Sequence, residues 1–292
     1  MADGRVAAAK LGCSGGILTA GFFSSIASAI RDRRYSYLLL TLSLASTLCA
    51  QAPTAPASQE KNPPAASRID PKAQEVLNKA IQSLGGEAFL QAKSVYMRGR
   101  TYAISEDSAS GVVPFESTVE FPDKRRFSYG KDKPITLIND GEHGWQIDRY
   151  GMVRQPLEQV RRWKNGARYG YENLLRRVIR EDGVLVQDAG RDFTDNLAAR
   201  VVTITDAQQV QIRVYLSTVN SLPIRVTYRV QNPETHDWEE FGEMYSDYRD
   251  FQGIQTPRHV TRSLDGDRYS EVFRNVVEYN REIPANYFTP GS

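Results

Sequence analysis

The sequence contains very little cysteine, with two residues, Cys13 and Cys49, in a chain of 292. Both lie before the region in which the patterns typical of a globular domain begin. We therefore expect the folded part of the chain to have no disulfide framework and to depend on a hydrophobic core. The length that follows residue 50 is sufficient to form such a core.

Histidine is also scarce, and His143, His236 and His259 are the three in the chain. None lies at helical or strand spacing from another metal ligand, and the chain has no HExxH, cysteine-pair or calcium-loop motif. A G-x-S-x-G match at 12–16 falls in the N-terminal leader, not in the strand–turn–helix context that a nucleophile elbow requires. We expect no catalytic residues, no metal and no cofactor, and thus a protein that is not an enzyme.

A strong excess of charge of one sign is missing as well, since the formal net charge is +2. A nearly neutral chain does not create the global positive field with which proteins attract nucleic acid or anionic membranes. We therefore expect no nucleic-acid partner. Any electrostatic recognition has to come from a local group of charges.

The N-terminal region has the layout of a secretory signal. The apolar run 37–48 is shorter than the roughly 20 residues of a membrane-spanning helix, and small residues surround Ala50. We expect export to the periplasm with cleavage after Ala50. Lipidation of Cys49 is the alternative, which Leu48 directly before it disfavours. The basic residues before the apolar run are Arg31, Arg33 and Arg34.

Three regions follow from the composition: a leader at 1–50, a disordered Pro/Ala/Ser-rich tether at 51–68, and a single domain at 69–292. Asp70 followed by Pro71 is a helix-start signal. Apolar residues continue at helical spacing until Gly85 and Gly86, which end the helix. A second short helix is predicted at 87–93.

The rest of the domain has mainly strand patterns. Within 223–231, for example, Ile224, Val226 and Tyr228 alternate with polar residues, as in a strand with one buried face. Short connections without strand–helix alternation indicate an antiparallel sheet and a mainly β (α+β) fold. Strands are predicted at 95–104, 114–121, 125–130, 135–139, 143–149, 151–154, 184–188, 198–205, 209–217, 223–231, 238–251, 256–264 and 269–279.

One helical segment, 156–180, interrupts the strands. Its apolar stripe includes Tyr171 and Leu174, and Gly166 and Gly170 weaken its middle by about 1 kcal/mol each relative to alanine. Its basic residues are either a solvated face or, if the segment is a movable cover over a ligand, contacts for lipid headgroups or a partner protein. The candidates for these contacts are Arg161, Arg162 and Arg168.

Three stretches carry a resemblance to a known family. They are "STVEFPDKRRFSYGKDKPITLINDGEHGWQID" at 117–148, "DYRDFQGIQTPRHV" at 247–260 and "IPANYFTP" at 283–290. The first is similar to a strand, a proline turn, an aromatic strand and a hairpin with the pattern DG-x-x-x-W. Together they resemble the LolA-like periplasmic lipoprotein carriers and outer-membrane lipoprotein-sorting proteins.

This resemblance implies a strongly curved antiparallel sheet that forms an incomplete β-barrel, is closed by helices and has an apolar hollow for acyl chains. The family's carriers have an arginine directly before the proline of the first stretch, which holds the lid. Phe121 occupies that position here, before Pro122, so we do not expect the same lid lock. Candidates to line or cover the hollow are Phe121, Phe127, Trp145, Trp163, Tyr171, Leu174 and Tyr228.

The function implied is a non-enzymatic periplasmic binding or carrier protein for lipoproteins or other acylated or apolar ligands. We expect a monomer whose ligand is a lipid or an acylated protein and whose further partner is a protein of the inner or outer membrane. Two alternatives stay open. One is an envelope interaction or sensor module whose curved sheet binds a protein segment. The other is an envelope hydrolase, which would need a polar constellation inside the hollow.

Overall fold

The computed structural model describes residues 68–105, 108–109 and 111–291. The predicted leader, the cleavage site at Ala50, Cys49, the G-x-S-x-G match and nearly all of the predicted tether lie outside these residues. No helix in the described part of the chain is long and apolar enough to span a membrane.

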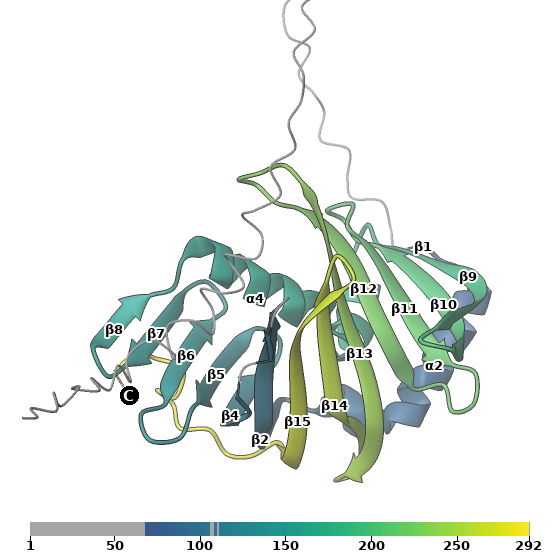
Figure 1. Ribbon diagram of the computed structural model, residues 1–292. Helices are drawn as coiled ribbons and strands as arrows, with labels where there is room; N and C mark the ends of the chain where they lie inside the picture. The colour runs from purple at the N-terminus through teal and green to yellow at the C-terminus, as the bar shows by residue number, and fades with distance from the viewer. Residues whose placement is uncertain (1–67, 106–107, 110, 292) are drawn as a thin grey trace, which may run out of the picture.

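The described residues form one large curved sheet of 15 strands in the order β1-β9-β10-β11-β12-β13-β14-β15-β2-β4-β5-β6-β7-β8, with β3 paired to β2 (Figure 1). Every pair is antiparallel except β1 with β9. Because β1 and β8 end this order, the sheet is open and not closed into a barrel. The predicted fold class, a curved antiparallel incomplete barrel with helices, is confirmed.

The strands agree closely with the alternating segments of the sequence. The first group comprises β1 (Arg68–Ile69), β2 (Ser94–Ser105), β3 (Ser108–Ala109), β4 (Val113–Glu120), β5 (Lys124–Tyr129), β6 (Ile135–Asp140), β7 (Gly144–Asp148) and β8 (Gly151–Arg154). The second comprises β9 (Leu185–Thr194), β10 (Leu197–Thr205), β11 (Gln211–Ser217), β12 (Pro223–Gln231), β13 (Trp238–Phe251), β14 (Ile254–Leu264) and β15 (Asp267–Tyr279).

Two-residue turns join the long C-terminal strands. Gln252 and Gly253 between β13 and β14 both have positive φ angles, 57° and 81°. Asp265 and Gly266 between β14 and β15 do so as well, with 51° and 91°. Such turns twist in the same sense as the flanking strands, and they therefore set the register of these hairpins.

Helices cover one face of the sheet, which we call the inner face. The helix α2 (Pro71–Leu84) starts at Asp70, whose side chain accepts a hydrogen bond from the backbone N–H of Lys72 at 2.7 Å. It is followed by α3 (Glu87–Gln91), and after β8 come α4 (Leu157–Tyr169), α5 (Tyr171–Arg176) and the 3-10 turn η1 (Val178–Arg180). Buried side chains of α2, α3, α5 and the inner face form one continuous hydrophobic core.

The segment 156–180 is not the single helix that the sequence predicts. Gly170 has extended backbone angles, φ −58° and ψ 146°, so α4 ends there and α5 begins in a new direction. Glycine has little preference for the helical conformation, which explains why the break falls at this residue.

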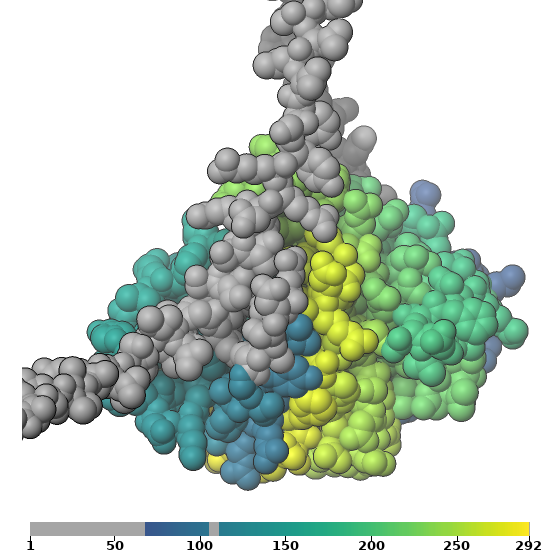
Figure 2. Space-filling view, in the orientation of Figure 1, coloured from purple at the N-terminus to yellow at the C-terminus, as the bar shows by residue number. Residues whose placement is uncertain are grey.

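The opposite, outer face is covered in part by the C-terminal segment 281–291. The Tyr287 hydroxyl lies 3.2 Å from that of Thr118 on β4, and its carbonyl accepts a hydrogen bond from Arg126 on β5 at 3.1 Å. Phe288 is buried, and Ile138 on β6, which is in register with Arg126, is fully buried too. In the space-filling view, β2, β15 and β13–β14 lie next to one another on the molecular surface (Figure 2).

The end of α2 provides a test of how tightly it packs on the sheet. A Cβ atom at Gly85 (φ 123°) would lie 2.3 Å from the carbonyl oxygen of Gly253, whereas a Cβ at Gly151 (φ 122°) would have nothing within 4 Å. Both alanine variants carry the backbone strain of positive φ, and Gly85→Ala adds the clash.

We expect Gly85→Ala to lower the free energy of unfolding in urea by at least about 1 kcal/mol more than Gly151→Ala does. Equal losses in the two variants would show that α2 does not approach the β13–β14 turn as described.

Candidate functional site

A partly enclosed cavity of about 370 Å³ lies between α4 and the inner face of the sheet. Strands from β5 through β4, β2, β15, β14 and β13 to β12 contribute to its wall, and α4 with the start of α5 covers it. Its volume is within the roughly 300–1,000 Å³ of ligand pockets. The larger apolar side chains in the wall are Val95, Met97, Phe115, Val119, Phe121, Phe127, Trp163, Tyr228, Phe241 and Val272.

Aromatic rings form rigid surfaces at both ends of this cavity. The ring of Phe127 lies 5.6 Å from that of Phe115. At the other end, the ring of Tyr228 lies 5.3 Å from that of Phe241 and 4.9 Å from that of Tyr169. Rings packed at these separations have few rotamers, so they keep an apolar surface in place without collapsing into the space.

The wall of the same cavity also contains charged side chains, and the sequence pattern did not predict them. Four arginines and three glutamates line it: Arg125, Arg162, Arg262, Arg274, Glu158, Glu172 and Glu243. Charges in such surroundings are stable only when paired and hydrogen-bonded. Their pairing therefore decides what the cavity can bind.

Glu243 and Arg262 form a well-bonded pair. The Arg262 Nε lies 2.7 Å from a Glu243 carboxylate oxygen, and the Tyr245 hydroxyl donates to the other oxygen at 2.7 Å. Burial would raise the pKa of Glu243, but the positive charge and hydrogen bond of Arg262 outweigh it, so this pKa lies below its ordinary value. The pair is an internal part of the wall.

Arg125 is in a different situation. Within the described residues no carboxylate lies within 4.0 Å of its guanidinium, and its Nε is buried with no hydrogen-bond partner. Its contacts are the ring of Trp163 on α4 at 4.0 Å, the ring of Phe127 at 5.4 Å and the Asn139 side-chain oxygen at 3.5 Å. Burial, together with the positive charge of Arg262, lowers the pKa of Arg125 to about 9, so it remains protonated at neutral pH.

The cover is attached to the sheet at the turn after β4. Asn173 on α5 donates hydrogen bonds to the carbonyl of Pro122 at 2.6 Å and to that of Ala167 on α4 at 2.7 Å. The guanidinium of Arg176 lies over the Phe121 ring at 4.1 Å. This contact between cover and sheet thus combines an arginine of α5 with an aromatic ring of the turn after β4.

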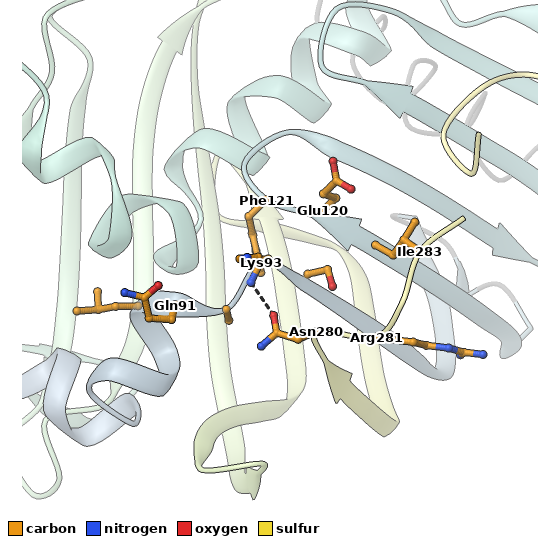
Figure 3. A pocket seen from close by; sticks show the side chains of 10 residues that line it. Gln91, Lys93, Glu120, Phe121, Asn280, Arg281 and Ile283 are labelled. Atoms are coloured by element: carbon orange, nitrogen blue, oxygen red, sulfur yellow. Dashed lines mark hydrogen bonds between the residues drawn. The ribbon is translucent and has the colours of Figure 1, made fainter. Parts of the chain in front are cut away.

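A second depression is an open groove of about 650 Å³ at the edge formed by α3, β2, β4 and the chain after β15. Figure 3 shows Lys93, whose backbone N–H donates to the Asn280 side chain at 2.7 Å, with Glu120 and Arg281 nearby. Phe121 lines both this groove and the cavity under α4. The groove is more open to solvent and the cavity has the more apolar lining, so the cavity is the better candidate for an apolar ligand.

The structure brings four of the predicted hollow residues to the cavity and places three elsewhere. Phe121, Phe127, Trp163 and Tyr228 line it. Trp145 does not, because it is in register with Ile138, whose side chain is on the outer face. Tyr171 and Leu174 lie in the hydrophobic core beside the cavity, where the ring of Tyr171 packs on those of Phe89 and Tyr245.

The three arginines predicted to contact headgroups are all engaged within the protein. Arg161 bonds to Glu158 and to the Gln231 carbonyl, and Arg162 bonds to Glu158 at 2.5 Å and Glu239 at 3.4 Å. Arg168 pairs with Glu181 at 2.6 Å and with Asp206 at 3.4 Å. These contacts fasten α4 to its surroundings. Binding of a headgroup by any of them would have to replace an internal carboxylate.

A hydrogen-bonded Ser–His–Glu chain occurs on the other side of the sheet. The Ser246 hydroxyl lies 3.1 Å from Nδ1 of His259, whose Nε2 lies 2.8 Å from Glu271. Ser246 is exposed in the middle of β13, where the β14 ladder pairs with the backbone, so no free N–H groups form an oxyanion hole beside it. It does not supply the hollow constellation that a hydrolase needs. No group of three or more metal-binding side chains occurs among the described residues.

Because Arg262 has a carboxylate partner and Arg125 has none among the described residues, we expect their substitution by methionine to change the stability of the protein in different ways. Arg262→Met would leave the Glu243 carboxylate half-buried without its partner and is expected to lower the free energy of unfolding by about 2 kcal/mol or more. Arg125→Met would remove a buried charge that has no carboxylate, and we expect the free energy of unfolding to be unchanged or higher. Urea denaturation of both variants measures this difference. A loss for Arg125→Met as large as that for Arg262→Met would contradict it.

Comparison with known proteins gives likenesses in structure only, because no protein-family model and no curated protein matches the sequence. Similar solved structures include a LolA superfamily protein from Nitrosomonas europaea, with 14% identity and a TM-score of 0.48 over 74% of this chain and 97% of that one. An outer-membrane lipoprotein-sorting protein domain from Vibrio parahaemolyticus has 9% identity and a TM-score of 0.48 over 74% and 97%.

A DUF1329 family protein from Desulfovibrio piger has 8% identity and a TM-score of 0.48 over 74% and 96% of the two chains. Two of these three structures carry the name of the family that the sequence resembles. Since all three TM-scores are below 0.5, the functional conclusions below depend on the cavity and its residues.

Proposed function

We propose that this protein is a non-enzymatic binding protein that carries an acylated or otherwise apolar ligand in the cavity under α4. The observation that carries the proposal is the partly enclosed space of about 370 Å³ between a helix and the inner face of the sheet, with aromatic and aliphatic side chains around most of it. Burial of an acyl chain there would contribute about 0.8 kcal/mol per methylene group.

The contacts that attach α4 and α5 to the turn after β4 indicate where a ligand could enter the cavity. Phe121 separates the open groove from the cavity and is held by Arg176, while Asn173 ties α5 to the same turn. In this proposal the groove is the entrance, and the chain of the ligand passes Phe121 into the cavity.

The wider setting of this function is part of the proposal. The leader and cleavage after Ala50 would deliver the protein to the periplasm, where an apolar ligand in transit between membranes needs protection from water. A protein of the inner or outer membrane would then load or accept the ligand. A lipoprotein is one cargo of suitable chemistry, and a free lipid is another.

A second candidate function is binding of a protein segment by the sheet. The observation in its favour is the edge strand β8, which pairs only with β7 among the described strands. Met152 and Val153 on β8 are 52% and 59% exposed, and Leu157 at the start of α4 is 88% exposed. An exposed strand edge with apolar side chains is suited to the addition of a partner strand.

Gly166 on α4 offers a test that separates occupancy of the cavity from stability of the cover. Gly166 lines the cavity, and a Cβ there would meet only the Tyr228 hydroxyl, at 4.0 Å. Gly166→Leu should fill the space and weaken binding of a fluorescent fatty acid at least about tenfold. Gly166→Ala is the matched control, because it improves the helix equally while leaving the space open.

Both variants are expected to unfold at an equal or higher temperature than the unsubstituted protein. Native mass spectrometry of the protein purified from the periplasm, followed by solvent extraction, should show a lipid bound to the unsubstituted protein and lost from Gly166→Leu. If no lipid co-purifies and no fatty acid binds, the carrier function is wrong. A specific protein partner found in that case would favour the second candidate.

A further inference from the structure

Two side chains that touch at one end of the cavity each have a buried hydrogen-bond donor without an acceptor among the described residues. These donors are Nε of Arg125 on β5 and the indole Nε1 of Trp163 on α4. The guanidinium and the indole ring are in contact at 4.0 Å. Buried donors in native proteins nearly always have a partner, so two adjacent ones without any indicate the place of an acceptor that is not part of the chain.

The other arginines of the cavity show that Arg125 is a special case. Arg262 has Glu243, and Arg162 has Glu158 and Glu239. Arg274 donates to the carbonyl of Pro257 at 3.2 Å. Arg274 has no carboxylate within 4.0 Å among the described residues, but none of its nitrogen atoms is buried without a partner. Arg125 is the one of the four that lacks a carboxylate in this part of the chain and also has a buried Nε without an acceptor, and its nearest oxygen partner is a neutral amide at 3.5 Å. An uncompensated buried cation costs free energy, and a ligand can recover that cost only if it is an anion.

The geometry around Arg125 suits one end of an amphiphile. Arg125 is in register with Val119 on β4 and Asn139 on β6, but no residue of β6 lines the cavity, so Arg125 lies at its β5 end. The apolar wall extends from there under α4 toward Phe241 and Tyr228. A single-chain ligand can thus place its charged group at Arg125 and its chain along this wall.

We propose that Arg125, assisted by the indole N–H of Trp163, binds the carboxylate or phosphate of an anionic single-chain amphiphile whose hydrocarbon chain occupies the rest of the cavity. This inference rests on the proposed carrier function and names the chemistry of its ligand. A planar guanidinium offers an anionic oxygen pair two parallel hydrogen bonds, which a neutral ester or amide cannot accept with the same strength. The cavity therefore selects for charge at one end as well as for apolar length.

The experiment compares an acid with its neutral ester at the same chain length. The full chain, expressed with its own leader and freed of co-purified lipid, is titrated with cis-parinaric acid and with methyl cis-parinarate at pH 8. The unsubstituted protein should bind the acid at least about tenfold more tightly than the ester. Displacement of the acid by stearate and by lysophosphatidic acid shows whether the carboxylate or the phosphate is preferred.

Three variants assign this preference to its residues. Arg125→Met should reduce the ratio of the two affinities to about one, and its thermal unfolding temperature shows that the fold is retained. Trp163→Phe keeps an aromatic ring but removes the donor, and should reduce the ratio about threefold. Arg249→Met, which changes an exposed arginine paired with Asp247 at 3.2 Å, is the control and should leave the ratio unchanged.

The outcomes are distinct. Equal binding of acid and ester by the unsubstituted protein would overturn this inference and leave the carrier function intact. If the unsubstituted protein binds neither the acid nor the ester, both this inference and the carrier function are wrong. A tenfold preference that Arg125→Met retains would place the anion elsewhere in the cavity and also overturn the inference.

Discussion

The ladder between β15 and β2 is the interaction on which the rest of the structure depends. It joins strands from the C-terminal half of the chain to those that follow the first helices, so that β9–β15 and β2–β8 become one sheet. At Gly99 the two backbones approach so closely that a Cβ would lie 1.8 Å from the carbonyl oxygen of Phe273. Since the cavity wall extends over both sides of this ladder, the cavity exists only because the ladder forms.

The cavity itself follows from how the inner face is covered. The helices α2 and α5 bring leucine, alanine and tyrosine side chains that fill the space beneath them. The part of α4 over the cavity presents Gly166, Ala167 and Gly170, and small residues leave volume that the wide aromatic wall cannot close. Close packing elsewhere and small residues at one place thus leave a space between α4 and the sheet, which is the arrangement a binding protein requires.

The polar side chains on the two faces of the sheet differ in how their hydrogen bonds and charges are paired. On the outer face, Ser246, His259 and Glu271 are linked to one another by hydrogen bonds. On the inner face, the pair of Glu243 with Arg262 is complete in itself, while Arg125 is left with aromatic rings and a distant amide. A low-polarity setting makes an unsatisfied charge far more consequential than the same charge at the surface.

Much of the fold could be predicted from the sequence, because local features determine it. The cap at Asp70, the two-residue turns at Gln252-Gly253 and Asp265-Gly266, and the alternation in 223–231 each depend on neighbours in the chain. The lid position at Phe121 and the aromatic residues Phe127, Trp163 and Tyr228 were also predicted for the hollow. These candidates came from the resemblance to the LolA-like family and from the large aromatic character of the side chains, while the stripe residues Tyr171 and Leu174 lie in the core beside the cavity.

The tertiary structure alone decided which face and which partner each side chain has. Alternation shows that Trp145 and Gln146 point in opposite directions, but only the register of β6 with β7 places Trp145 on the outer face. Similarly, Arg125 and Arg262 look alike in the sequence, and cross-strand pairing gives Glu243 to one and leaves the other without a carboxylate. The sequence by itself determined the strands, turns and helix starts, because these depend on contacts between near neighbours. The cavity and its unpaired charge depend on contacts between residues far apart in the chain, and only folding establishes those.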